Sequence, residues 1–309
     1  MNRNFILTTN AGKYVLRQVL SHSHYRRSSD LEFELSYLNY LRKAGFPYAV
    51  PSAIPTRTRK LFAKLRQRYF WLYKFIEGRV IEKLNESHFA QLTRMMGTYH
   101  QLIEKSRLDN EEPSLDLYGR HSTLKEIESY GLEILRKHRK TREDITFMEE
   151  SARLIPLLHS LDEGPYSNLK RYPIHRDIIP ENLIWQGPKL VGLLDFEHVS
   201  GTNEPTVKDI AVTLQSVCRD KKVKHRLDLK LATRFLQHYR KWHSLSKREV
   251  QLIPNLLVSG FIEDFAWTYW MLRNDPERAT PDALKLCSRA ALRSYEDREE
   301  ITQALLSQG

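Results

Sequence analysis

The residues best suited to do chemistry are two aspartates and an asparagine, closely spaced in the second half of the chain. Asn182 follows Asp177 by five positions, and Asp195 follows Asn182 by thirteen. Phosphoryl transfer needs one carboxylate that orients the attacking hydroxyl and accepts its proton, together with oxygen ligands that hold magnesium against nucleotide phosphates. The spacing therefore predicts a phosphoryl-transfer site in which Asp177 is the catalytic base and Asn182 and Asp195 are magnesium ligands.

The segments around these residues predict how they are positioned. Asn182 directly precedes the apolar run 183–185, and Asp195 ends the apolar run 190–194. A Gly-Pro turn separates the two runs, which predicts two short strands with the polar side chains at their ends. His175 lies at the start of the same loop, and we expect it to brace the loop by hydrogen bonding rather than to react.

Arg17 and Glu34, far upstream, are the candidates for a clamp on the nucleotide phosphates. Arg17 lies in a strand-like run and can neutralise phosphate through its planar guanidinium. Four leucines then recur at helical spacing, at positions 31, 35, 38 and 41. Glu34 lies one turn before Leu38 at the edge of this apolar stripe, so we expect it to turn inward, towards Arg17. Glu32 is the alternative carboxylate.

The pattern of apolar residues predicts a β-rich segment followed by a mostly helical one. Strand-like runs are 5–9, 14–19, 53–56 and 68–75. Helices are expected near 86–105, 120–139, 142–160, 206–218, 225–242, 247–273 and 281–306. The sequence therefore predicts a bilobal α+β fold, with a nucleotide-binding lobe at 1–77 and a larger catalytic and substrate-binding lobe at 78–309.

Composition excludes several classes of protein. The N-terminus lacks the long apolar core of a signal peptide. The most apolar later stretch, 253–272, contains Glu263 and Asp264 side by side, which argues against a membrane span. Cys218 and Cys287 are the only cysteines, too few for a disulfide framework or a zinc site. We expect a cytoplasmic protein.

The chain is basic, with a formal net charge of +11. The basic residues are densest in the runs 57–68 and 219–226. Phe62 is the one aromatic residue in these two runs, and neither run has a known nucleic-acid-binding motif. We interpret them as a solvated hairpin and a loop leading into a helix, and we expect no nucleic-acid partner.

Several motifs together resemble the aminoglycoside phosphotransferase, choline kinase and homoserine kinase superfamily, which has a protein-kinase-like fold. The resemblance rests on the segments 4–17, 34–47, 75–78, 96–100, 195–197 and 208–211, in addition to the loop around Asp177. It implies ATP and Mg²⁺ as cofactors and transfer of the γ-phosphoryl group to a hydroxyl of a small molecule. It also implies adenine contacts to the backbone near 71–75 and a structural supporting role for Asp209.

The sequence departs from this family at two places. It starts almost at the segment that resembles the second strand of the small lobe, so either the true start lies further upstream or the first strand and its phosphate-covering loop are lacking. Arg17 stands where a kinase lysine is expected. These departures keep open the alternative of a non-catalytic binding or structural protein with the kinase fold.

A protein kinase is the third alternative. Such enzymes usually have a lysine where this chain has Ile179, and D-F-G where it has D-F-E at 195–197. Asp209 comes only fourteen residues after Asp195, which is too soon for a full activation loop. These differences favour a small-molecule acceptor.

The acceptor itself is less clearly indicated. Glu263 and Asp264 could hold an amine, and nearby aromatic side chains could form a cage around a cation. The cage candidates are Phe261, Phe265, Trp267 and Trp270. The interpretation we favour is a core-facing helix with two solvated carboxylates, because Phe261 and Phe265 also fit helical core spacing.

Overall fold

The computed structural model describes residues 2–19, 28–66, 68–106, 108, 119–200, 203–220 and 222–307, and the structural statements below concern these residues. They form two compact units. Unit 1 draws on the ranges 1–113, 171–204 and 241–243, and unit 2 draws on 114–170, 205–240 and 244–309. The predicted lobe boundary at residue 77 lies inside unit 1 and stays a prediction.

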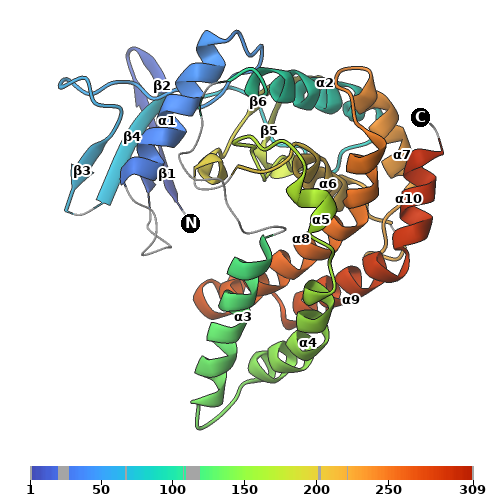
Figure 1. The fold of residues 1–309 in the computed structure, drawn as a ribbon. Helices are drawn as coiled ribbons and strands as arrows, with labels where there is room; N and C mark the ends of the chain where they lie inside the picture. The colour runs from blue at the N-terminus through green and yellow to red at the C-terminus, as the bar shows by residue number, and fades with distance from the viewer. Residues whose placement is uncertain are drawn as a thin grey trace. The chain divides into compact units, whose positions relative to one another are not determined.

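Unit 1 contains a four-stranded antiparallel sheet (Figure 1). Its strands are β1 (Arg3–Thr9), β2 (Gly12–Val19), β3 (Ala63–Leu65) and β4 (Arg68–Lys74), in the order β1-β2-β4-β3. A two-residue turn joins β1 and β2, and their seven residue pairs run without a register shift. The strand predicted at 53–56 is wrong, because only Ala53 forms a bridge, with Tyr73 of β4.

Helix α1 (Ser28–Lys43) lies beside this sheet in Figure 1. The predicted leucine stripe is confirmed, since all four leucines are almost fully buried. Glu34 is buried with them, while Glu32 is exposed. The inward orientation predicted for Glu34 from its place beside the stripe is therefore confirmed.

The remaining elements of unit 1 hold the loop that carries Asp177. They are α2 (Glu86–Ile103), the 3₁₀ turns η2 (Pro180–Asn182) and η3 (Glu197–Val199), and the hairpin of β5 (Leu183–Gln186) and β6 (Lys189–Leu193). Gln91 of α2 ties the hairpin down, because its amide donates to the carbonyl of Pro188 at 2.7 Å and accepts from the N–H of Leu190 at 3.0 Å.

Unit 2 is helical and is organised around the long helix α8 (Lys247–Asn274) (Figure 1). The other helices are α3 (Arg120–Leu135), α4 (Arg142–His159), α5 (Gly164–Ser167), α6 (Val207–Val217), α7 (Leu229–Arg240), α9 (Pro281–Glu296) and α10 (Arg298–Leu306), with a 3₁₀ turn η4 (Pro276–Arg278). All of these helices except α7 pack directly on α8. No helix among the described residues is long and apolar enough to cross a membrane.

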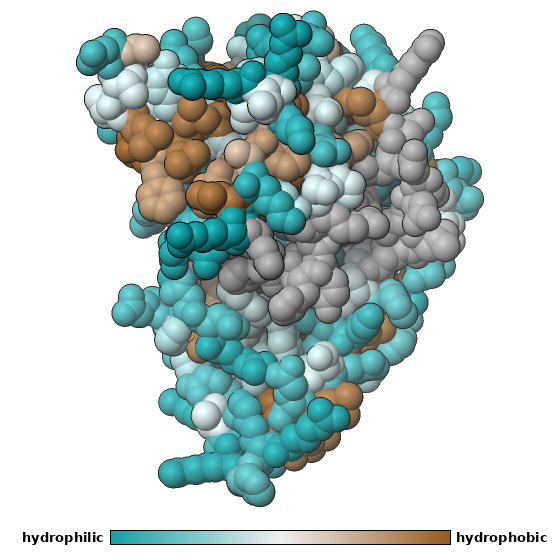
Figure 2. Space-filling view, turned by 90° about the vertical axis from the view of Figure 1, so that its left-hand side faces the viewer, coloured by the Kyte–Doolittle hydropathy of each residue, from teal (hydrophilic) through white to brown (hydrophobic). Residues whose placement is uncertain are grey.

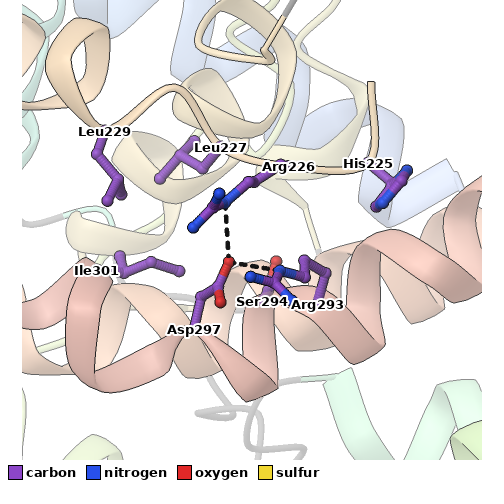
Figure 3. A pocket seen from close by; sticks show the side chains of 8 residues that line it. All are labelled: His225, Arg226, Leu227, Leu229, Arg293, Ser294, Asp297 and Ile301. Carbon is purple, nitrogen blue, oxygen red and sulfur yellow. Dashed lines mark hydrogen bonds and ion pairs between the residues drawn. The ribbon is translucent and has the colours of Figure 1, made fainter. Parts of the chain in front are cut away.

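The helix predicted at 281–306 is wrong as a single element, because it breaks at Asp297. This residue ends α9 and precedes α10, and its carboxylate accepts from Arg226 at 3.2 Å and from Arg293 at 2.7 Å (Figure 3). Arg226 also donates to Glu300 at 3.0 Å. The basic run at 219–226 thus contributes a structural ion-pair network, and the hollow that these side chains line is too small to hold a ligand.

Candidate active site

The catalytic-base candidate is held by the metal-ligand candidate that follows it. The side-chain amide of Asn182 donates to the carboxylate Oδ2 of Asp177 at 2.7 Å and to the Asp177 carbonyl at 2.9 Å. Both bonds use Nδ2, so the amide orientation is fixed. A carboxylate held in this way is pre-oriented for a hydroxyl group, which is what a catalytic base requires.

His175 hydrogen-bonds to the same loop through both of its ring nitrogens. Its Nε2 donates to the carbonyl of Leu194 at 2.9 Å, and its Nδ1 accepts from the N–H of Asp177 at 3.2 Å. One ring nitrogen therefore acts as donor and the other as acceptor. The bonds agree with the bracing role predicted for His175.

Leu194 brings the three chemically important residues together. Its N–H donates to the carbonyl of Asn182 at 2.8 Å, and its carbonyl accepts from His175. Asp195 follows directly, so its carboxylate begins where the loop and β6 meet. Arg176 and Asp195 both have positive φ angles, 65° and 64°. Such angles are uncommon for residues other than glycine and often mark sites where geometry serves function.

Arg17 makes its closest ion pair with Asp195. Its Nη2 lies 2.6 Å from Asp195 Oδ1 and 3.6 Å from Glu197 Oε2. Burial would lower the pKa of the Arg17 guanidinium, but the charges of Asp195, Glu34 and Glu197 outweigh it and raise that pKa. Burial would likewise raise the pKa of Asp195, but the charge and hydrogen bond of Arg17 hold it below its ordinary value. Both groups therefore stay charged.

Glu34 and Glu197 complete this acidic surrounding of Arg17. Glu34 is 1% exposed and acts on Arg17 as a neighbouring buried charge. Glu197 accepts from the side-chain amide of Asn2 at 2.7 Å, which ties the beginning of the chain to this site. Sequence reasoning missed Glu197 and treated it only as a departure from D-F-G. Glu197 follows Asp195 by two residues, and this closeness in sequence could have identified it as a site residue.

The residues present fit a magnesium ion shared with nucleotide phosphates. Nδ2 of Asn182 and Oδ1 of Asp195 have protein partners, which leaves Oδ1 of Asn182 and Oδ2 of Asp195 as oxygen donors. Magnesium commonly takes only one or two protein oxygens and completes its shell with phosphates and water. Within the described part of the chain, no three His, Cys, Asp or Glu side chains are grouped to hold a metal by themselves.

The connection that follows β4 borders a cavity of about 440 Å³. Its walls come from the connection at 74–77, the segment 46–52 after α1 and the β5–β6 hairpin. None of the seven predicted site residues lines it. The adenine contacts expected near 71–75 stay a prediction.

Asp209 belongs to unit 2, unlike the other six predicted site residues. It is fully buried in the first turn of α6, and its carbonyl accepts from the hydroxyl of Thr213 at 2.9 Å. Its supporting role stays a prediction.

The two carboxylates on α8 are partly exposed, with 29% of the Glu263 side chain and 47% of the Asp264 side chain accessible, and both also make polar contacts. Glu263 Oε1 lies 3.1 Å from the ammonium of the buried Lys208. Asp264 accepts from the amide of Gln215 at 2.6 Å. Partial desolvation of this carboxylate, with a smaller contribution from the charge of Glu263, raises the pKa of Asp264 to about 6, against the opposing charge of Arg219 and hydrogen bond of Gln215.

The four aromatic residues on α8 do not converge on one cage. Phe265 stacks on Phe147 in the core, at 5.0 Å between ring centroids, and Arg219 lies over Phe261. Trp267 and Trp270 stack on each other, with centroids 4.7 Å apart. The core-facing interpretation of Phe261 and Phe265 is confirmed by their burial.

Comparison with known sequences connects this geometry to a family. The model of the phosphotransferase enzyme family APH matches residues 1–246. The homoserine kinase of Sinorhizobium medicae (strain WSM419) is 28% identical over 262 residues, which cover 84% of this chain and 72% of that protein. The homoserine kinase of Zymomonas mobilis subsp. mobilis is 25% identical over 283 residues, covering 92% of this chain and 81% of that protein.

Solved structures confirm the predicted bilobal, protein-kinase-like α+β fold. The amicoumacin kinase hAmiN, in complex with AMP-PNP, Ca²⁺ and Ami, has a TM-score of 0.67 at 18% identity and covers 98% of this chain and 85% of its own. A microcompartment-associated aminopropanol kinase has a TM-score of 0.69 at 15% identity, covering 97% of this chain and 90% of its own.

Proposed function

We propose that this protein transfers the γ-phosphoryl group of ATP to a small amino alcohol. The premise is that the chain belongs to the phosphotransferase enzyme family and is a kinase with an alcohol group as acceptor. The observation that carries the proposal is the hydrogen-bonded arrangement of Asp177, Asn182 and the Leu194–Asp195 strand end. It supports a proton acceptor beside two free oxygen ligands, the groups that phosphoryl transfer needs.

Asp177 is assigned to the acceptor hydroxyl. Its carboxylate would orient that hydroxyl for in-line attack and take its proton as the new P–O bond forms. The bonds from Asn182 support this role, because they restrict the carboxylate to one orientation. His175 and Leu194 act as positioning residues that keep the loop and strand end in register.

Arg17 is assigned to the phosphates of ATP. Its guanidinium is buried and charged, and it is held among Asp195, Glu197 and Glu34. Phosphate oxygens compete with these carboxylates for the N–H groups of Arg17. Some of these N–H groups can therefore donate to the nucleotide instead of to Asp195. Magnesium held by Asn182 and Asp195 would neutralise charge that develops on the phosphates. Glu34 then keeps Arg17 in place through its nearby buried charge.

Homoserine is the first acceptor to test. The two homoserine kinases above match more than four-fifths of the chain at 25% to 28% identity. An amino alcohol also agrees with the aminopropanol kinase among the fold neighbours. An aminoglycoside- or choline-like acceptor is the second candidate.

The test is an acceptor screen with ATP and magnesium, in which phosphorylated product is identified by mass spectrometry. Homoserine, choline and an aminoglycoside are assayed separately against wild type and Asp177→Asn. We expect product from an amino alcohol with wild type and none above background with Asp177→Asn. A matched control is Asp282→Asn, an exposed aspartate in the first turn of α9, which should keep full activity.

Two outcomes would overturn the proposal. Nucleotide binding without any phosphorylated acceptor would favour the non-catalytic alternative. Phosphate incorporated into a protein substrate, with none in any small molecule, would favour the protein-kinase alternative. If Asp177→Asn formed as much product as wild type, the protein would still be a kinase, but Asp177 would have no part in its mechanism.

A further inference from the structure

The loop between α3 and α4 is short, exposed and rich in cations. Five of the seven residues 136–142 are Lys or Arg, and none is acidic. One of the five is paired, because the ammonium of Lys137 lies 2.6 Å from Asp144 Oδ1. The other four are exposed and have no ion-pair partner in the part of the chain that the structure describes: Arg136, Arg139, Lys140 and Arg142. We call this loop and the adjoining helix turns, residues 132–145, the α3–α4 tip.

Exposed aliphatic side chains flank these cations on both helices. In the last turns of α3, Leu132 is 56% and Leu135 62% exposed, and near the start of α4 Ile145 is 49% exposed. Leu132 and Leu135 are three positions apart, so they share one side of α3. The core contacts of the hairpin come instead from Ile134 and Phe147, which are fully buried. A group of exposed aliphatic residues beside unpaired cations indicates a surface that binds something.

The α3–α4 tip is held in one conformation, and its acidic residues are mostly neutralised. Thr141 caps α4, because its hydroxyl accepts from the N–H of Asp144 at 3.2 Å and its own N–H donates to the carboxylate of Asp144 at 2.9 Å. Glu133 is paired with Arg273 at 2.6 Å. Glu143 is the one acidic residue of the tip without an ion pair among the described residues. The four unpaired cations therefore leave the tip with a net positive charge.

The figures show the same combination of side chains at this end of the helical unit. Figure 1 shows the loop that joins α3 and α4 at one end of unit 2. The corresponding lower end of Figure 2 carries hydrophilic and apolar side chains next to each other. Cations and aliphatic groups are thus presented together on one surface.

The composition of the tip fits an anionic lipid surface better than other partners. Residues 131–145 contain no Phe, Tyr or Trp, so no such ring is available to stack on nucleic-acid bases. A second copy of the tip would bring like charges together, which opposes association. At a bilayer the two kinds of side chain separate by depth, because aliphatic groups enter the boundary of headgroups and acyl chains while Lys and Arg reach the lipid phosphates.

We propose that the α3–α4 tip docks this protein reversibly on bilayers that contain anionic phospholipid. Each cation near such a surface strengthens binding about five-fold, and salt screens this attraction. The assay is sedimentation with phosphatidylcholine vesicles that either contain about 30% phosphatidylglycerol or contain none. Wild type should sediment with the anionic vesicles at about 0.1 M salt, should bind the neutral vesicles much more weakly, and should be released from the anionic vesicles at about 1 M salt.

Two matched pairs of variants separate the tip from charge and apolar surface elsewhere. Arg139→Gln combined with Lys140→Gln should weaken binding to anionic vesicles about 25-fold. Arg57→Gln combined with Lys60→Gln removes the same charge from exposed positions in unit 1 and should leave binding within about two-fold of wild type. Leu135→Ser should weaken binding about ten-fold. Leu65→Ser, at a residue 63% exposed on β3, should not.

The outcomes decide the proposal in either direction. All of these variants replace exposed residues, and urea unfolding checks that each keeps the stability of wild type. Wild type that does not bind anionic vesicles, equal binding to both kinds of vesicle, or equal losses in the tip and control variants would each overturn it. Tighter binding to single-stranded RNA than to vesicles, lost in the same tip variants, would replace it with a nucleic-acid site. Asp177→Asn should bind vesicles like wild type, so the result is independent of the proposed phosphoryl transfer.

Discussion

Arg17→Met tests whether the buried guanidinium organises the acidic residues of the site. The substitution keeps much of the side-chain volume and removes the charge from a position where only 6% of the side chain is exposed. It removes the positive charge that acts on the buried Glu34 and breaks the ion pair with Asp195. Breaking a buried ion pair costs about 3–5 kcal/mol. Because Asp195 and Glu197 are each 34% exposed, we expect a loss of unfolding free energy near 3 kcal/mol.

Urea unfolding at pH 7.5 measures this loss, and Lys13→Met is the matched control. Lys13 lies on the same strand but is half exposed, with its nearest carboxylate, on Glu77, at 4.0 Å, so its loss should cost less than about 1 kcal/mol. Adding Asp195→Asn to Arg17→Met should recover part of the loss, since the unpaired carboxylate is then removed. An Arg17→Met protein as stable as wild type would refute this reasoning. The reasoning would also be refuted if the double variant lost the sum of the unfolding free energies lost by the two single variants.

Two further predictions concern the scaffold. Gly78→Ala should destabilise unit 1 by about 2–4 kcal/mol in urea unfolding, because Gly78 has φ +141° and an added Cβ would lie 2.5 Å from Ile184 Cγ2. Gly187→Ala, with φ +56° and no atom within 4 Å, should cost only about 1 kcal/mol, and equal losses would contradict the steric argument. Asp264→Asn should stabilise the protein at pH 8 and have little effect at pH 4.5. The folded-state pKa of Asp264 is raised to about 6, so native stability falls as pH rises from its ordinary value of 3.8 through 6. A pH-independent effect of Asp264→Asn on the urea midpoint would contradict that pKa.

Local sequence patterns predicted the elements that position the site. Helical leucine spacing predicted both α1 and the inward side of Glu34, because one buried stripe fixes the orientation of every residue on the helix. The alternation of apolar runs and turns predicted the β5–β6 hairpin within one residue at each end. These features depend on neighbours in sequence, which is why pattern reasoning found them.

Features that depend on distant partners were not predictable in the same way. Asp297, where α9 ends, accepts a hydrogen bond from Arg226, which lies 71 residues away in sequence. Glu197 gains its importance from Arg17 and Asn2, both at the far end of the chain. Spacing likewise showed that Glu263 and Asp264 are adjacent but not that Lys208 and Gln215 contact them. The local spacing of apolar residues does not indicate which residues far apart in sequence form ion pairs.

The rate of phosphoryl transfer by Asp177→Asn tests the central claim most directly. The change preserves the shape of the side chain but removes its negative charge and its capacity to accept a proton. With ATP, magnesium and the acceptor found in the screen, kcat should fall by about 10²- to 10⁴-fold. Nucleotide affinity and unfolding free energy should stay close to those of wild type. A kcat within a few-fold of wild type would contradict the assignment of Asp177 as the catalytic base.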